Sequence, residues 1–163
     1  MDDIRKEQQC DRGDRDSLEE RVRRLEDLRA VEAVLVAYAR CVDGRDAEGV
    51  GALFTEEGTL RVPEASPLVG RDRIANVYRR LLGALKASTH VVSNQEARLV
   101  GPDRAEVRCV LWAWEGFEGS LVFEGAQNRF SFGRYEAVMV RGEDGRWLME
   151  SLTISFAGQT ASK

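Results

Sequence analysis

Two residues offer the clearest route to acid–base chemistry: His90, the only histidine of the chain, and Asp43, which ends a helical pattern. An imidazole can act as a base near neutral pH, and a carboxylate beside it fixes its tautomer and stabilises the imidazolium. Such a base removes a proton next to a carbonyl, which leads to dehydration, isomerisation or aldol-type cyclisation. Asp-Gly is also ordinary turn chemistry, and a lone strand histidine is often structural. The two residues by themselves leave both interpretations open.

Other kinds of site find less support in the sequence. Cys10, Cys41 and Cys109 are widely spaced and form no CxxC or Cys/His pattern, so neither a disulfide framework nor a zinc site is indicated. Cys41 and Cys109 lie on segments expected to be packed. The chain has no G-x-S-x-G motif and no glycine-rich phosphate loop, which argues against covalent catalysis and nucleotide binding. We expect no metal and no cofactor.

The composition indicates a single domain. A chain of 163 residues with 43% hydrophobic content can build one core. Its net charge is −4 and its positive residues are scattered among acids, which argues against nucleic acid as a partner and favours a small or neutral ligand. The charged N-terminus has no apolar h-region, and no run of about 18 apolar residues occurs. The sequence therefore predicts a cytoplasmic protein that neither is exported nor spans a membrane.

The first half of the chain has the spacing of helices. Residues 1–16 are polar and are expected to form a frayed tail. Ser17 and Glu20 form a capping-box pattern, and apolar residues then recur at three- and four-residue steps, which predicts one long helix ending near Asp43. The further predicted elements are a short helix over Ala47–Phe54, a strand over Gly58–Val62, a loop over Pro63–Pro67 and a helix from Arg71 to Leu85.

The second half has the pattern of strands. From Thr89 onward we expect about four long antiparallel strands, in the first of which His90, Val92 and Asn94 share one face. Helices followed by a strand meander indicate an α+β fold, with helices on one face of a curved sheet. We expect one domain over residues 17–158 and a tail over 159–163. The turn signals are Gly101-Pro-Asp103, Glu115-Gly116, Gly119, Gly125 and Gly142–Gly145.

Several segments resemble, in order and spacing, those of SnoaL-like proteins in the nuclear-transport-factor-2-like superfamily. The stretch Tyr38–Phe54 looks like the family's first helix, which ends in Asp, and the helical turn that ends in Leu-Phe. The resemblance spans about residues 20–157 and implies a cone-shaped α+β barrel, whose N-terminal helices pack on a strongly curved, mostly antiparallel sheet that encloses a pocket. The other matching segments are Gly58–Arg61, Gly70–Ile74, Thr89–Asn94, Phe132–Glu136 and Asp144–Trp147.

The resemblance also implies a reaction class. The family contains scytalone-dehydratase-like lyases, polyketide cyclases, ketosteroid isomerases and a dehydrochlorinase, together with non-catalytic modules. It implies that Asp43 and His90 form a dyad and that Tyr38 polarises a carbonyl or helps a hydroxyl leave. A cofactor-independent lyase, isomerase or cyclase for a hydrophobic, polyketide- or terpenoid-like carbonyl compound is therefore predicted; the alternative is a non-catalytic small-molecule-binding or assembly module. Leu152 replaces a basic residue of the dehydrochlorinase, and the second histidine of the scytalone-dehydratase-like enzymes is absent, which argues against those particular reactions.

Aromatic residues of the strands pose a question of placement. Trp112 and Trp114 share one face of their strand, where they either cover the sheet or a subunit interface, or line the pocket; Phe130 raises the same question. Arg134 either orients a carbonyl or pairs with a nearby acid. Because the open face of the sheet must be covered, we expect a homodimer or higher oligomer. The expected substrate-binding residues are Asn94, Phe54, Trp112, Trp114, Phe130 and Arg134.

Overall fold

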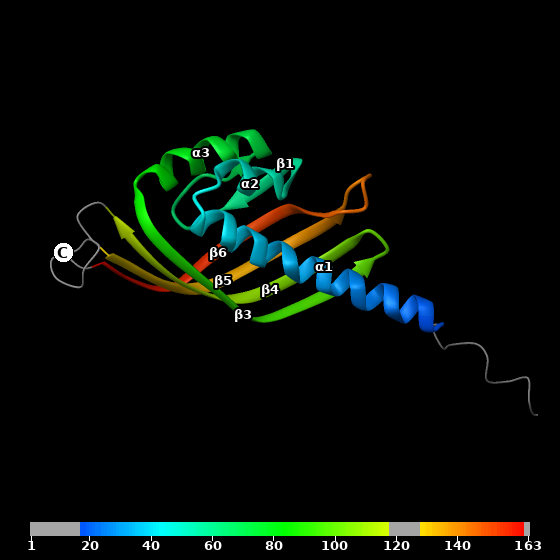
Figure 1. The fold of residues 1–163 in the computed structure, drawn as a ribbon. Helices are drawn as coiled ribbons and strands as arrows, with labels where there is room; N and C mark the ends of the chain where they lie inside the picture. Colours follow the sequence, from blue (N-terminus) through cyan, green and yellow to red (C-terminus); the bar gives the residue numbers. More distant parts are fainter. Residues whose placement is uncertain (1–16, 118–127, 162–163) are drawn as a thin grey trace, which may run out of the picture.

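The computed structural model describes residues 17–117 and 128–161, and within them the helices lie together on one face of a curved sheet (Figure 1). The predicted frayed tail over residues 1–16 lies outside the described residues. The α+β class is confirmed. The elements in chain order are α1 (Leu18–Asp43), α2 (Ala47–Ala52), β1 (Phe54–Arg61), β2 (Leu68–Val69), α3 (Arg71–Gly83), β3 (Leu85–Gly101), β4 (Arg104–Phe117), β5 (Asn128–Arg141) and β6 (Trp147–Ala161).

The sheet has the strand order β2-β1-β6-β5-β4-β3. Its neighbouring strands are antiparallel except for β1 and β6, which run parallel. The end strands β2 and β3 do not pair with each other, so the sheet curves around the helices without closing. The expected cone-like fold, with helices packed on a strongly curved, mostly antiparallel sheet, is confirmed, and the sheet stays open at its two end strands.

Irregular pairing bends this sheet. The register shifts between Ser93 and Glu96 in β3, and again between Phe132 and Gly133 where β5 pairs with β6. Such bulges kink a strand and increase its local twist. At the second shift, a Cβ atom on Gly133 would lie 1.9 Å from the backbone oxygen of Ser155, so only a glycine allows this approach of β5 and β6.

The helix α1 begins where the sequence predicts. The Ser17 side chain accepts from the Glu20 N–H and the Glu20 side chain accepts from the Ser17 N–H, which completes the capping box. The apolar stripe of α1 is buried only from Val31 onward, whereas Leu18 and Leu25 are exposed. In Figure 1 the N-terminal end of α1 extends past the sheet. The C-terminal half of α1 is therefore the part anchored in the core.

Other boundaries differ from the predictions for local reasons. The second helix ends at Ala52 because Phe54 already belongs to β1, and β3 begins at Leu85 rather than Thr89. The turn predicted at Glu115-Gly116 lies inside β4, whereas the signals at Gly119 and Gly125 fall outside the described residues. No helix of the described chain is long and apolar enough to cross a membrane.

Candidate active site

The last residue of α1 meets β3 through a set of hydrogen bonds. Asp43 Oδ1 lies 2.6 Å from His90 Nδ1 and accepts from Ser88 Oγ at 2.9 Å, while Oδ2 accepts from the His90 backbone N–H at 2.9 Å. A carboxylate at a helix C-terminus faces the negative end of the helix dipole. The Ser88 hydroxyl and the His90 N–H donate to the carboxylate, and together with the contact to the His90 ring they offset that unfavourable position and fix the carboxylate in one orientation.

The position of β3 in the sheet makes this arrangement possible. It is an end strand, paired with β4 on one side only, so the backbone of its other edge needs partners. Asp43 supplies one by accepting the His90 N–H. The His90 side chain is 8% exposed and that of Asp43 is 27% exposed. His90 is thus held by Asp43 through both its backbone N–H and its ring nitrogen Nδ1.

A cavity of about 380 Å³ lies between the helices and the inner face of the sheet, and His90 forms part of its wall. Much of that wall is apolar and includes Val42, Leu85, Leu111 and Ile154. No other described residue hydrogen-bonds the His90 ring, so Nε2 is the ring nitrogen left for a ligand. An apolar cavity with a few placed polar groups is the usual form of a small-molecule site.

Tyr38, Tyr78 and Tyr135, the three tyrosines of the chain, gather in the wall of the same cavity. The Tyr38 and Tyr78 hydroxyls hydrogen-bond each other, and the Tyr38 ring meets those of Tyr78 and Tyr135 edge-on, with centroids 6.1 Å and 5.5 Å apart. Burial raises the pKa of Tyr78 to about 12 and raises the pKa values of Tyr38 and Tyr135 well above the usual value. These hydroxyls therefore remain protonated and can donate hydrogen bonds.

The sequence interpretation did not identify Tyr78 or Tyr135 as site residues. Tyr78 belongs to the buried stripe of α3 and Tyr135 to an inward position of β5, where each resembles an ordinary core residue. The available signal was the phenolic hydroxyl, because a buried tyrosine normally needs a hydrogen-bond partner.

A second polar group lines the cavity where β4, β5 and β6 lie side by side. Arg129 Nε donates to Glu115 Oε2 at 2.5 Å, and Gln159 Nε2 donates to Ser131 Oγ at 3.2 Å. Ser131 is only 3% exposed. The sequence interpretation missed all four residues, in part because it assigned Glu115 to a turn.

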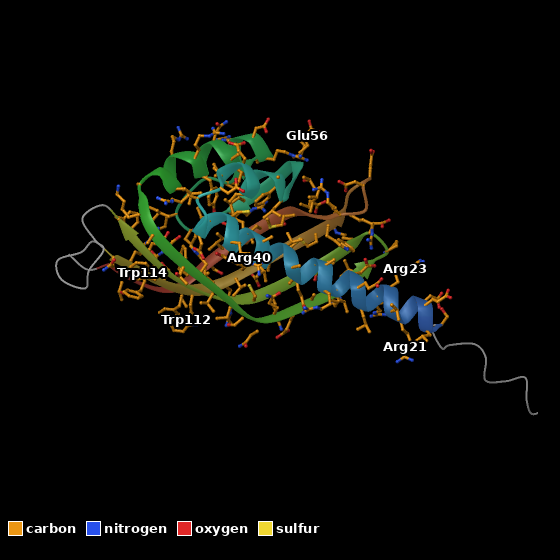
Figure 2. All side chains as sticks on the ribbon, in the orientation of Figure 1. Arg21, Arg23, Arg40, Glu56, Trp112 and Trp114 are labelled. Atoms are coloured by element: carbon orange, nitrogen blue, oxygen red, sulfur yellow. The ribbon has the colours of Figure 1, made fainter. Side chains whose placement is uncertain are left out.

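Trp112 and Trp114 lie on the outer face of the sheet, away from the helices (Figure 2). Trp112 is 57% exposed and stacks on Phe132 with ring centroids 5.3 Å apart, and Phe130 on the same face is 52% exposed. Strand alternation explains this, because Leu111, next to Trp112, points inward and lines the cavity. Of the two placements that the sequence left open, these aromatic residues therefore take the outer face, and their assignment as substrate contacts is corrected.

Three further expected contacts also lie outside the cavity lining. Asn94, with φ of 50°, stands at the β3 bulge, where the alternation that relates it to His90 breaks and its side chain is exposed. Phe54 is fully buried in the core at the start of β1. Arg134 is exposed on the outer face because its neighbour Tyr135 points inward.

Neither of the two cysteines in the described residues, Cys41 and Cys109, provides an activated nucleophile. Burial raises the pKa of Cys109 to about 11 and also raises that of Cys41, so both thiols are protonated at neutral pH. Among residues 17–117 and 128–161, no three His, Cys, Asp or Glu side chains are grouped to hold a metal ion. The described site offers acid–base chemistry instead.

A larger and more open groove of about 580 Å³ follows the outer face of the sheet. Its charged residues pair across strands, Arg98 with Glu106 at 2.8 Å and Arg108 with Glu96 at 2.6 Å. The groove contains neither the histidine nor a tyrosine. The inner cavity is therefore the better candidate for a reaction site.

Comparison with known proteins identifies the family of the chain. The sequence profile of the SnoaL-like domain matches residues 23–153, whereas no curated protein matches the chain. A candidate scytalone dehydratase from Novosphingobium aromaticivorans is 21% identical over 86% of this chain and 90% of its own, with a TM-score of 0.76. A ketosteroid isomerase-like protein from Erwinia carotovora atroseptica is 22% identical over 82% of this chain and 98% of its own, with a TM-score of 0.68. A hexachlorocyclohexane dehydrochlorinase from Novosphingobium barchaimii is 15% identical over 87% of this chain and 94% of its own, with a TM-score of 0.74. At these identities the solved structures establish a shared fold.

Proposed function

This chain belongs to the SnoaL-like family, and from that premise we propose that it is a cofactor-independent lyase, isomerase or cyclase that removes a proton next to a carbonyl group. The observation that carries the proposal is the hydrogen bond between Asp43 and His90 in the cavity wall. The apolar lining supports a hydrophobic substrate of polyketide- or terpenoid-like character. The family includes lyase- and isomerase-type enzymes, which agrees with this reaction class.

In the proposed reaction His90 is the base and Asp43 is its orienting partner. Asp43 accepts the proton on Nδ1, so Nε2 keeps a lone pair and takes a proton from the substrate carbon, while the carboxylate stabilises the imidazolium. If the substrate carries a β-hydroxyl, its C–O bond then breaks and the leaving oxygen departs as water with the proton from His90. Return of that proton to another carbon gives isomerisation, and attack of the carbanion on a second carbonyl gives cyclisation.

The tyrosines are proposed to stabilise the developing enolate. Tyr38 and Tyr78 share a hydrogen bond and keep their protons, so one hydroxyl can donate to a carbonyl oxygen while the other supports it. A donor placed where negative charge develops lowers the barrier more than it favours the ground state. Tyr38 thus has the assisting role that the family resemblance implies.

A β-hydroxyketone, 4-hydroxy-4-phenylbutan-2-one, tests this proposal. Its dehydration yields a conjugated enone that absorbs strongly in the ultraviolet, and exchange of its α-protons in deuterated water follows proton removal directly. We expect wild-type protein to accelerate α-proton exchange, and His90→Ala and Asp43→Asn each to lower the rate at least about a hundredfold, the loss expected for a general base. Asp46→Asn is the matched control, because Asp46 caps α2 outside the site and asparagine caps equally well.

Equal exchange rates in wild-type protein and His90→Ala would contradict the proposal. Binding of a carbonyl compound without any chemical change would instead support the non-catalytic binding module. The two single variants should also lose no further activity when combined, because both remove the same base.

We further propose that the protein works as a homodimer in the cytoplasm. The exposed aromatic patch formed by Val91, Trp112, Phe130 and Phe132 supports this, because a patch of large apolar side chains is usually covered. Further along the outer face, Arg98 pairs with Glu106 and Arg108 with Glu96 within the chain. A second copy of the chain, related by a two-fold axis, can cover this patch with its own identical apolar patch.

A further inference from the structure

One cation inside the cavity has no role in the proposed proton transfer. Arg129 is fixed along one edge of its guanidinium, where Nε donates to Glu115, and its Cζ lies 5.5 Å from the centroid of the Phe117 ring. Its side chain is 43% exposed and that of Glu115 is 12% exposed. The two terminal nitrogens hydrogen-bond no described residue, although Arg129 lines the cavity. The guanidinium is thus held in place through Nε, and within the described part of the chain its terminal nitrogens face the cavity without a protein acceptor.

The register of the sheet places this group in reach of the same ligand as His90. His90 pairs with Ala113 in β4, and Glu115, two residues further along β4, pairs with Arg129 in β5. Two strand spacings and two residues along a strand separate the backbones of His90 and Arg129 by about 12 Å. Both side chains point inward from those positions and line one cavity. A ligand that lies along the sheet can contact both.

The charge of the cavity wall differs from that of the whole chain. Among the described lining residues, Arg80 and Arg129 are positive and Glu115 is negative, so the wall carries one net positive charge while His90 is neutral. Asp43 lies behind His90, outside the lining, where it contacts the His90 ring and accepts from the Ser88 hydroxyl and the His90 N–H. The chain as a whole has a net charge of −4. This local excess of positive charge favours an anionic ligand, whereas the overall charge indicated a small or neutral one.

We propose that the terminal nitrogens of Arg129 bind a carboxylate of the substrate, so that the substrate is a hydrophobic carboxylic acid whose reactive carbon lies at His90. An arginine offers two parallel N–H donors that match the two oxygens of a carboxylate, and such charge-assisted pairs are strong and directional. Glu115 is a positioning residue in this arrangement, because it fixes the guanidinium through Nε. The assignment rests on the proposed function only in taking this cavity as the substrate site.

Binding of 2-naphthoate and its neutral isostere 2-naphthamide tests the assignment by calorimetry. We expect wild-type protein to bind naphthoate more tightly than naphthamide. Arg129→Gln should weaken naphthoate about 10- to 100-fold, the effect of a lost charged hydrogen bond, and change naphthamide little. Arg129→Lys should recover part of the loss. The matched control is Arg98→Gln, which removes an exposed arginine paired with Glu106 on the outer face and should change neither affinity.

Two results would overturn the assignment: no measurable naphthoate binding, or an equal loss of both ligands in Arg129→Gln. Glu115→Gln adds a readout that a purely structural ion pair would not give. The glutamine side-chain oxygen can still accept from Arg129 Nε, but the negative charge that repels a carboxylate ligand is gone. Naphthoate should therefore bind more tightly to Glu115→Gln than to wild type. Weaker binding of both ligands would contradict the positioning role.

The carboxylate site and the proton-transfer proposal can fail separately. Naphthoate binding requires no turnover and should persist in His90→Ala. If that variant exchanges α-protons as fast as wild type while naphthoate still depends on Arg129, the lyase proposal fails and the anion site remains. If α-proton exchange depends on His90 but Arg129→Gln binds naphthoate as tightly as wild type, the carboxylate site at Arg129 fails and the lyase proposal remains.

Discussion

The tyrosine cluster should make the protein lose stability at alkaline pH. Tyr38, Tyr78 and Tyr135 are at most 8% exposed, and burial raises the pKa of Tyr78 from 10.0 to about 12. The native protein therefore holds protons that the unfolded chain releases once the pH passes about 10, the pKa of an unfolded tyrosine. The stabilisation is fully present below that pH and is lost as the pH rises through the native pKa.

The expected loss is large for a domain of this size. A difference of two pKa units for Tyr78 corresponds to about 3 kcal/mol of unfolding free energy between pH 10 and 12. Tyr38 and Tyr135 add to this loss, because burial raises their pKa values as well. The total stability of a domain is typically about 5–15 kcal/mol. We therefore expect the chain to unfold before its tyrosines ionise one by one.

Near-ultraviolet absorbance of tyrosinate and far-ultraviolet circular dichroism, followed in parallel, measure this coupling. Tyrosinate should appear only as the circular dichroism is lost. Tyr78→Phe should be less stable at neutral pH, because it leaves the Tyr38 hydroxyl without its partner, but its stability should fall less steeply above pH 10. Tyrosinate formation near pH 10 in a protein that keeps its circular dichroism would refute the burial argument.

Gly133→Ala should lower the free energy of unfolding in a urea titration by about 1–3 kcal/mol, because the new Cβ has no space at this approach of β5 and β6. Gly83→Ala is the control: a Cβ there has no atom within 4 Å, so this variant should be neutral or more stable by about 0.5–1 kcal/mol. Equal effects of the two substitutions would contradict the proposed sheet geometry. Trp112→Glu should convert the proposed dimer to monomers in sedimentation equilibrium. Val69→Glu is the control, because Val69 is an exposed apolar residue on β2 outside the aromatic patch, and it should leave the dimer intact. A dimer retained in Trp112→Glu would exclude the aromatic patch as the interface.

Local signals predicted some parts of the fold almost to the residue. The capping box at Ser17 and the Asp-Gly pair at Asp43 are short-range features, and the first helix begins and ends there. The turns after β3 and β5 follow glycine-containing signals in the same way. Glu115-Gly116 carries a similar signal, yet β4 continues through it, because pairing with β3 and β5 outweighs a local turn preference.

Long-range placement was less accessible. The contact between Asp43 and His90 joins residues 47 positions apart, and no spacing in the sequence predicts it; the family resemblance supplied that expectation. Strand alternation correctly put Trp112 and Trp114 on one face but could not say which face was buried. The bulge beside Asn94 and the gathering of three tyrosines from α1, α3 and β5 depend on pairing between distant segments. These features become visible only in three dimensions.

The tautomer of His90 tests the central claim most directly. Because His90 is the only histidine, the nitrogen NMR spectrum of isotope-labelled protein reports a single imidazole. A neutral ring that carries its proton on Nδ1, shared with Asp43, and a bare Nε2 is the predicted state, and Asp43→Asn should remove this preference. A ring protonated on Nε2, or one whose spectrum is the same in Asp43→Asn, would contradict the assignment of His90 as the base.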